Sequence, residues 1–179
     1  MTKLEVLQDK TILAVDDEHD VLETVQEMLE DYGNLVLHTA KEFDRARQLL
    51  HSHNYDLVIL DIMGVRGFDL LEIAAHRGFP VVMLTAHALN PEALKKSIEL
   101  GARAYLPKER LAALPDFLAD ILRFSYRSVW RKALDDVIGL FNERFGSNWK
   151  KSEQQFWTEF EQTLEVDEPA IISEEKPEK

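Results

Sequence analysis

Cysteine is absent from the sequence, and so is any long apolar run. The first absence excludes disulfide bonds, thiolate catalysis and cysteine-ligated zinc. The second excludes a membrane-spanning helix, which requires roughly 20 predominantly apolar residues. Residues 1–10 also lack the apolar segment of a secretory signal. Together these absences predict a cytoplasmic protein without a membrane partner.

Positive charge is scarce. The chain carries 33 acidic and 21 basic side chains, and its net charge is −12. A negative charge of this size opposes attraction to nucleic acid and to anionic lipid. We therefore expect no direct contact with nucleic acid.

Short apolar runs alternate with helical patterns along most of the chain. Residues 12–15, 57–60 and 81–84 have the length and composition of buried strands, and residues 35–39 and 104–106 are weaker candidates. Strands that are apolar on both faces and alternate with helices indicate a parallel sheet covered on both sides. The sequence therefore predicts a doubly wound α/β fold with five strands in the flavodoxin-like order 2-1-3-4-5.

The same pattern predicts how the chain is divided. Residues 1–10 form a lead-in, and residues 11–124 form the α/β domain. Helical periodicity continues beyond this domain and predicts a helical extension over residues 125–164, broken near residues 146–148. Residues 165–179 are rich in acids and contain prolines, so we expect a disordered tail.

The extension carries an apolar stripe from Val129 to Phe145. Two partners suit this stripe: Trp157 and Phe160 of the same chain, or a second copy of the chain in a homodimer. The sequence leaves both open. No histidine follows His87, which excludes a histidine phosphotransfer helix in the extension.

Polar side chains follow four of the five predicted strands. Asp16 and Asp17 follow the first strand, Asp61 ends the third, Thr85 ends the fourth and Lys108 follows the fifth. The carboxyl ends of parallel strands share one crevice, so we expect these side chains to converge. Three neighbouring carboxylates raise one another's pKa unless a cation joins them, and Mg²⁺ accepts carboxylates, waters and a phosphate oxygen.

This set of groups predicts phosphoryl transfer. Asp61 is the expected nucleophile, because a carboxylate forms an aspartyl-phosphate when a metal shields the incoming anion. Lys108 supplies a positive charge for a phosphate oxygen. The protein's part in such a reaction is to position the groups and to neutralise charge on the phosphoryl.

Over roughly residues 11–124 the chain resembles the receiver domains of response regulators. The resemblance rests on Val15-Asp16-Asp17-Glu18, on Leu60-Asp61-Ile62-Met63, on Thr85-Ala86 and on Gly101-Ala102-Arg103-Ala104-Tyr105-Leu106-Pro107-Lys108. It implies that Asp17, Asp61 and the backbone carbonyl of Met63 contact Mg²⁺ directly, while Asp16 acts mainly through water. It also implies that a sensor histidine kinase or a phosphotransfer protein donates the phosphoryl group.

The resemblance further implies a switch. On phosphorylation of Asp61, the Thr85 hydroxyl would move to a phosphate oxygen and Tyr105 would turn inward into the vacated space. This exchange biases a surface with two states. His87 occupies a position at which the family tunes the lifetime of the phosphate.

The chain departs from the family at two places. Glu109 follows Lys108 where the family has a proline with a cis bond, and a cis bond to another residue costs about 3 kcal/mol. The segment Gly64-Val65-Arg66-Gly67 is one residue shorter than the common pattern. We expect altered loop geometry at both places.

The resulting hypothesis is a Mg²⁺-dependent receiver that accepts a phosphoryl group on Asp61 and signals through an unidentified downstream protein. Its only expected chemistry is its own phosphorylation and dephosphorylation. The alternative is a pseudo-receiver that is never phosphorylated and acts as a scaffold or adaptor. A phosphatase of the haloacid dehalogenase type fits poorly. It needs an aspartate two residues after its nucleophile, where Glu18 or His19 stands here.

Overall fold

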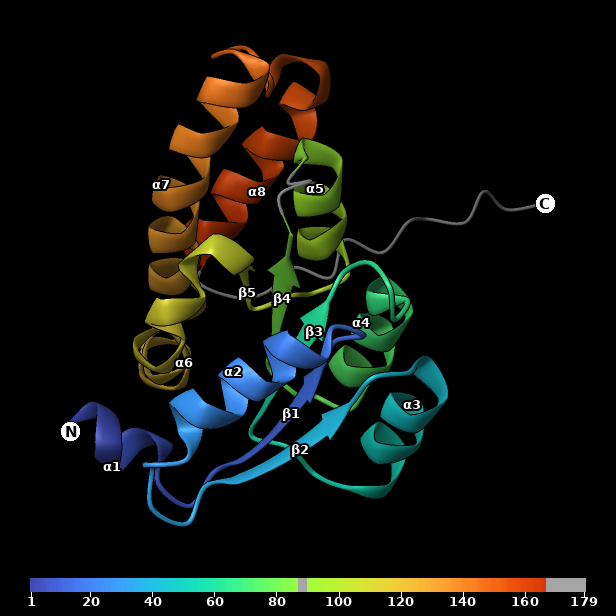
Figure 1. Cartoon of the computed structure of the whole chain (residues 1–179). Coiled ribbons are helices and arrows are strands. Elements are labelled where there is room, and N and C mark those ends of the chain that lie inside the picture. Colours follow the sequence, from blue (N-terminus) through green and yellow to red (C-terminus); the bar gives the residue numbers. More distant parts are fainter. Residues whose placement is uncertain (87–89, 167–179) are drawn as a thin grey trace.

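A parallel five-stranded sheet forms the centre of the computed structural model, which describes residues 1–86 and 90–166 (Figure 1). The strands are β1 (Thr11–Val15), β2 (Val36–Ala40), β3 (Leu57–Asp61), β4 (Val81–Thr85) and β5 (Ala104–Pro107). Their order is β2-β1-β3-β4-β5. This order confirms the predicted flavodoxin-like fold.

Five helices cover the two faces of the sheet: α2 (His19–Leu29), α3 (Phe43–Ser52), α4 (Gly67–His76), α5 (Pro91–Glu99) and α6 (Leu114–Arg123). Helices α2 and α6 lie against each other on one face, and α3, α4 and α5 follow one another on the other face. Covering on both sides explains why every residue of the central strands β3 and β4 is buried.

The strand register aligns the carboxyl ends of the strands. Val15 pairs with Leu60, the residue before Asp61. Thr85 pairs with Pro107, the residue before Lys108. The polar side chains that follow these strands therefore lie at one edge of the sheet.

The N-terminal segment contains a short helix, α1 (Lys3–Leu7). The Thr2 hydroxyl accepts a hydrogen bond from the Glu5 amide and the Glu5 carboxylate accepts one from the Thr2 amide, which forms a capping box. Val6 and Leu7 are buried, and α1 packs against α6. The predicted lead-in is thus partly helical, and the capping box is the sequence signal that indicates it.

The extension consists of two main helices, α7 (Tyr126–Phe145) and α8 (Gln154–Val166). The Ser125 hydroxyl caps the start of α7, and Gly146 ends this helix with a φ of 78°. A short 3-10 helix, η2 (Lys151–Glu153), leads into α8. Helix α8 ends two residues beyond the predicted extension, and the rest of the expected disordered tail, 167–179, lies outside the described residues.

The apolar stripe of α7 packs against α8 of the same chain. Ring centroids lie 5.7 Å apart for Trp130 and Phe160, 4.9 Å for Phe141 and Trp149, and 5.2 Å for Trp149 and Trp157. All five side chains are buried. The sequence left two partners open, and the structure shows the one within the chain. Most of the stripe is buried there, although Phe145 is 42% exposed. A homodimer through the extension stays a prediction.

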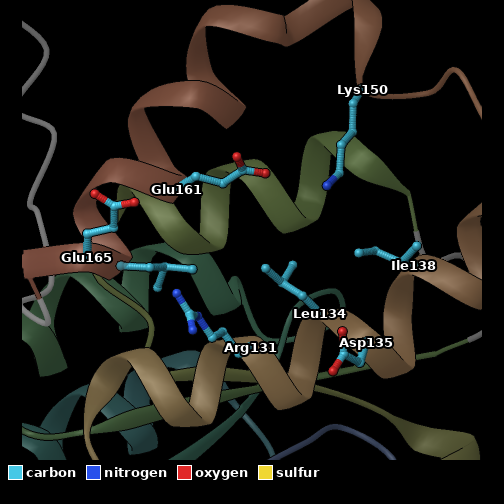
Figure 2. Close-up of a pocket in the computed structure, with 8 residues that line it drawn as sticks. Arg131, Leu134, Asp135, Ile138, Lys150, Glu161 and Glu165 are labelled. Atoms are coloured by element: carbon cyan, nitrogen blue, oxygen red, sulfur yellow. The ribbon is translucent and has the colours of Figure 1, made fainter.

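An open groove remains between α7 and α8. It has a volume of about 370 Å³, with Leu134 and Ile138 at its base and Arg131, Lys150 and Glu161 at its rim (Figure 2). Charges of both signs surround it, since Asp135 and Glu165 also line the groove. Within residues 1–86 and 90–166, no helix has the length and hydropathy needed to cross a membrane.

Candidate functional site

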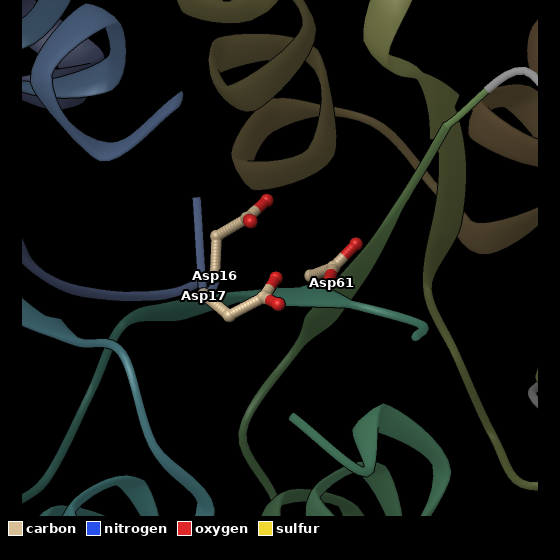
Figure 3. A group of neighbouring side chains, drawn as sticks. All are labelled: Asp16, Asp17 and Asp61. Atoms are coloured by element: carbon tan, nitrogen blue, oxygen red, sulfur yellow. The ribbon is translucent and has the colours of Figure 1, made fainter. Parts of the chain in front are cut away.

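Three carboxylates meet at the carboxyl edge of the sheet. Asp61 is the last residue of β3, and Asp16 and Asp17 directly follow β1. One carboxylate oxygen from each lies within 4.8 Å of the others (Figure 3). Asp16 is 1% exposed and Asp61 4% exposed, whereas Asp17 is open to solvent. The predicted convergence of these acids is therefore present.

Lys108 completes the cluster from the other side. It begins the 3-10 helix η1 (Lys108–Ala113), which directly follows β5. Its ammonium nitrogen lies 2.8 Å from Asp16 Oδ2, 2.8 Å from Glu18 Oε1 and 3.2 Å from Asp61 Oδ1. One lysine thus connects three acids.

Glu18 is a site residue that sequence reasoning missed as a partner of Lys108. Its amide donates a hydrogen bond of 2.9 Å to Asp16 Oδ1, which turns the chain sharply after β1. The turn brings the Glu18 side chain over the Lys108 ammonium. The sequence contains only a weak signal for this contact, an acid two positions after Asp16.

Burial sets the electrostatics of the cluster. It raises the pKa of Asp61 to about 6, with a further increase from Asp16 and an opposing effect of Lys108. Burial also raises the pKa of Asp16, again opposed by Lys108. For Lys108, burial lowers the pKa, but the neighbouring carboxylates of Asp16, Glu18 and Asp61 together outweigh burial and leave it raised. One lysine therefore leaves the negative charge of the site incompletely neutralised.

The residues present fit a divalent cation. Asp16 Oδ2 is buried and lies beside the Lys108 ammonium, yet it accepts no hydrogen bond of normal geometry. At Gly64 a Cβ atom would lie 2.4 Å from Asp17 Oδ1, so a side chain there would displace this carboxylate. Clustered carboxylate oxygens are the ligands that Mg²⁺ prefers.

The loop between β3 and α4 is tight. Gly64 and Arg66 have left-handed φ angles of 59° and 54°. The Met63 carbonyl oxygen, which the family resemblance assigns to the metal, accepts a hydrogen bond from the Val65 amide. The Arg66 guanidinium forms an exposed ion pair of 2.8 Å with Asp69. That this geometry differs from the family's stays a prediction.

The connection after Lys108 is regular. Among the described residues no peptide bond is cis, so the bond between Lys108 and Glu109 is trans. Lys108 nevertheless reaches the acidic cluster, because η1 begins directly at this residue. A proline after the lysine is therefore not required for its placement here.

Thr85 and Tyr105 lie beside the cluster. Thr85 is 6% exposed, and its hydroxyl donates a hydrogen bond of 3.3 Å to the Ala86 carbonyl. Tyr105 is 1% exposed; burial raises its pKa to about 12, and nearby Thr85 opposes this shift. The Tyr105 hydroxyl has no hydrogen bond of normal geometry. The Tyr105 side chain is thus buried. The predicted switch, in which Thr85 and Tyr105 move on phosphorylation, stays a prediction. His87 lies outside the described residues.

Fold and site together define a class of protein. It comprises doubly wound α/β domains with an acidic cluster, a hydroxyl and a lysine at the carboxyl edge of the sheet. The model of the response regulator receiver domain matches residues 12–117. The chain therefore belongs to this family. The match ends before α7 and α8.

Solved structures agree with this assignment. A CheY-like receiver domain protein from Methanospirillum hungatei is 27% identical, with a TM-score of 0.58, and the match covers 63% of this chain and 93% of that one. Chemotaxis protein CheY4 from Vibrio cholerae is 25% identical, with a TM-score of 0.56 and coverage of 63% and 98%. A two-component response regulator from Clostridium difficile is 24% identical, with a TM-score of 0.59 and coverage of 64% and 97%, and supports the fold alone. No curated protein sequence matches the chain.

The raised pKa of Asp61 predicts how stability depends on pH. The pKa of Asp61 is ordinarily 3.8 and is about 6 in the folded protein. As pH rises between these values, the unfolded chain loses this proton more readily than the folded one, so the metal-free protein loses stability. Above about pH 6 the loss in the free energy of unfolding stays constant. Asp61→Asn removes the charge. We expect it to raise the free energy of unfolding by about 2 kcal/mol near neutral pH and to have little effect near pH 4.

Urea denaturation in the presence of a chelator measures this effect. Asp44→Asn is the matched control, because the Asp44 side chain is 86% exposed. Added Mg²⁺ should stabilise the wild-type protein more than Asp61→Asn. If Asp61→Asn were instead less stable than the wild type near neutral pH, the prediction would be wrong. The attraction of Lys108 would then outweigh the cost of burying the Asp61 charge.

Proposed function

We propose that this receiver accepts a phosphoryl group on Asp61 from the phosphohistidine of a sensor histidine kinase or phosphotransfer protein, in a Mg²⁺-dependent reaction. The observation that carries the proposal is the position of the buried Asp61 carboxylate, 3.2 Å from Lys108 and beside Asp16 and Asp17. A nucleophile, a cation and further metal ligands are thus present in one small space.

The transfer exchanges one bond for another. An oxygen of Asp61 forms a bond to phosphorus while the bond between phosphorus and the donor imidazole nitrogen breaks, and the electron pair remains on that nitrogen. Asp61 is ionised at neutral pH despite its raised pKa of about 6, so it needs no base. Asp16, Asp17, Asp61 and the Met63 carbonyl would hold Mg²⁺, which neutralises charge on the phosphoryl oxygens.

Lys108 and Thr85 have separate roles in the proposal. The Lys108 ammonium binds a phosphoryl oxygen and neutralises charge that develops there. The Thr85 hydroxyl, now bonded to the Ala86 carbonyl, turns to another phosphoryl oxygen. Tyr105 responds to that turn, because its side chain lies beside Thr85.

The signal is passed on by contact with another protein, in the cytoplasm. The net charge of −12 supports an output that does not involve nucleic acid. The proposed chemistry is limited to self-phosphorylation from a donor and autodephosphorylation, so the protein is not an enzyme acting on a separate substrate.

One observation favours the alternative of a pseudo-receiver. The Met63 carbonyl is already bonded to the Val65 amide in the tight loop. The carbonyl oxygen keeps a second lone pair, so the cation loses this ligand only if the tight loop holds the oxygen away from the acids, and the domain then acts as a scaffold or adaptor.

Phosphoryl acceptance is tested directly by mass. The full chain is incubated with Mg²⁺ and acetyl phosphate, and intact-mass spectrometry should show the gain of one phosphoryl group. Asp61→Asn should show none, while Asp44→Asn should behave as the wild type, since its carboxylate is exposed. A wild-type chain that gains no mass would support the pseudo-receiver instead.

A further inference from the structure

Two histidines meet where the edge strand β2 lies beside α3 (Figure 1). His38 is in the middle of β2, and His53 directly follows α3. Their ring centroids are 5.0 Å apart and their ring planes are inclined by 82°. Tyr55 contacts both rings and comes just before β3, whereas Asp61 ends that strand. This histidine pair, His38 and His53, is therefore separate from the acidic cluster.

The hydrogen bonds of His53 leave one ring nitrogen able to bind a metal. The Ser52 hydroxyl donates its single proton to the Gln48 carbonyl, at 2.8 Å. Its oxygen also lies 2.8 Å from His53 Nδ1, so Nδ1 must be the donor in this second hydrogen bond. The lone pair of the neutral imidazole is then on Nε2. Because His53 is exposed, an ion can reach this nitrogen.

Tyr55 orients the His38 ring in a similar way. The Tyr55 hydroxyl and His38 Nδ1 share a hydrogen bond of 2.8 Å. Tyr55 is buried and packs edge-to-face against Phe79, which holds the hydroxyl in place. When Nδ1 donates to this hydroxyl, the His38 lone pair is on Nε2. A histidine that binds a metal typically donates its other ring nitrogen to such a neighbour, which fixes the tautomer and the orientation of the ring.

The spacing of the two rings fits two ligands on one tetrahedral ion. Zn²⁺ binds a histidine nitrogen at roughly 2.1 Å, which places the ion roughly 3.2 Å from the ring centroid. At a tetrahedral angle, two such centroids are about 5 Å apart. The observed separation is 5.0 Å. Among the described residues no third histidine or carboxylate joins the pair closely enough to share an ion, so water would complete the coordination.

The charges around the pair select the kind of metal. Burial lowers the pKa of His38, and His53 and Arg45 lower it further, so this ring is neutral at neutral pH. Arg77 donates to the carbonyls of Leu50 and His53 from the other side. Both guanidinium charges oppose a dication that is held by charge alone. Hard cations such as Mg²⁺ prefer oxygen ligands, whereas Zn²⁺, Ni²⁺ and Cu²⁺ bind imidazole.

We propose that His38 and His53 bind a divalent transition-metal ion, such as Zn²⁺, through their Nε2 atoms, and that Tyr55 is the positioning residue for His38. The ion joins the edge strand β2 to the segment between α3 and β3. Because it binds the folded chain, it stabilises the domain. The proposal concerns a second site and does not depend on phosphorylation.

Titration with Zn²⁺ tests the proposal on the full chain, prepared without a histidine tag. Excess Mg²⁺ is present to compete for the acidic cluster. We expect calorimetry to show one bound ion per chain, and side-chain ¹⁵N NMR to show shifted Nε2 resonances for His38 and His53 but not for the other histidines. Free Zn²⁺ at about ten times its dissociation constant should raise the midpoint of thermal unfolding by about 3 to 6 °C.

Three variants separate the ligands from their surroundings. His53→Ala removes an exposed ligand and should weaken Zn²⁺ binding at least tenfold, since losing even an orienting neighbour costs about 10-fold to 100-fold. Tyr55→Phe keeps the buried ring but loses the hydroxyl, and should weaken binding by about 10-fold to 100-fold while NMR shows a mixture of His38 tautomers. His51→Ala is the control, because His51 is an exposed histidine of α3 and should leave the affinity unchanged.

The outcomes are distinct from those of the phosphorylation test. Zn²⁺ binding that survives His53→Ala, or that shifts only the resonances of other histidines, overturns the proposal. A wild-type chain that binds no Zn²⁺ up to a concentration on the order of 1 mM overturns it as well. A Tyr55→Phe chain with unchanged affinity and tautomer removes the positioning role of Tyr55. A chain that binds Zn²⁺ at the histidine pair but gains no phosphoryl mass contradicts the proposed function alone.

Discussion

Replacing Lys108 with alanine is expected to slow phosphorylation strongly and to destabilise the metal-free protein. The substitution leaves the buried carboxylates of Asp16 and Asp61 without their cation. Removing one partner from a buried ion pair costs about 3 kcal/mol, and removing a group that stabilises a developing charge slows a reaction by about 100-fold or more. Both losses should appear together, in urea denaturation and in the rate of mass gain.

Two comparisons make the Lys108 result specific. Lys108→Arg keeps the charge and should recover most of the stability, but the planar guanidinium should restore phosphorylation only in part. Lys132→Ala removes a lysine that is 62% exposed and should change neither property. A Lys108→Ala protein that is as stable and as rapidly phosphorylated as the wild type would show that the three acids do not depend on this lysine.

Trp130→Ala is expected to cost about 3 to 5 kcal/mol of stability, because a fully buried indole is replaced by a cavity. The change also leaves the Ala102 carbonyl without its donor. Hydrogen exchange should then show both α7 and α8 detached from β5, since the T-shaped contact of Trp130 with Phe160 joins the two helices as well. Thermal or urea unfolding measures the size of the loss.

Trp130→Phe is the control for this prediction. It retains an aromatic ring but loses the hydrogen bond to Ala102, so the expected loss is about 1 kcal/mol from that bond plus a smaller packing effect. The extension should remain docked. Equal losses for Trp130→Ala and Trp130→Phe would show that the hydrogen bond, and not the buried ring, holds the extension to the receiver.

The receiver fold could be predicted from the sequence because short segments of the chain, taken one at a time, indicate its strands and helices. Each central strand is a short run that is apolar on both faces, and such runs form parallel sheets covered by helices. The predicted strands 57–60 and 81–84 agree with β3 and β4 to within one residue. Five strands of these lengths suit the order 2-1-3-4-5, and this prediction is confirmed.

The convergence of the candidate site followed from the same local information. Strand ends were identifiable, and parallel strands place their carboxyl ends at one edge, so Asp16, Asp61 and Lys108 had to meet. The contact between Glu18 and Lys108 was not predictable, because Glu18 lies beyond the strand end and its position depends on the sharp turn after β1. The roles of these residues in phosphorylation stay predictions.

The extension shows where sequence information ends. From the stripe between Val129 and Phe145 alone, the sequence determined that this segment is an amphipathic helix whose apolar face must be covered. It did not determine what covers that face, because hydrophobic attraction is non-directional and any complementary apolar surface satisfies it. Only the tertiary structure decided that the partner is α8 of the same chain, through contacts such as Trp130 with Phe160. Likewise, the placement of Lys95 against Glu153 depends on the packing of whole helices, which no local pattern encodes.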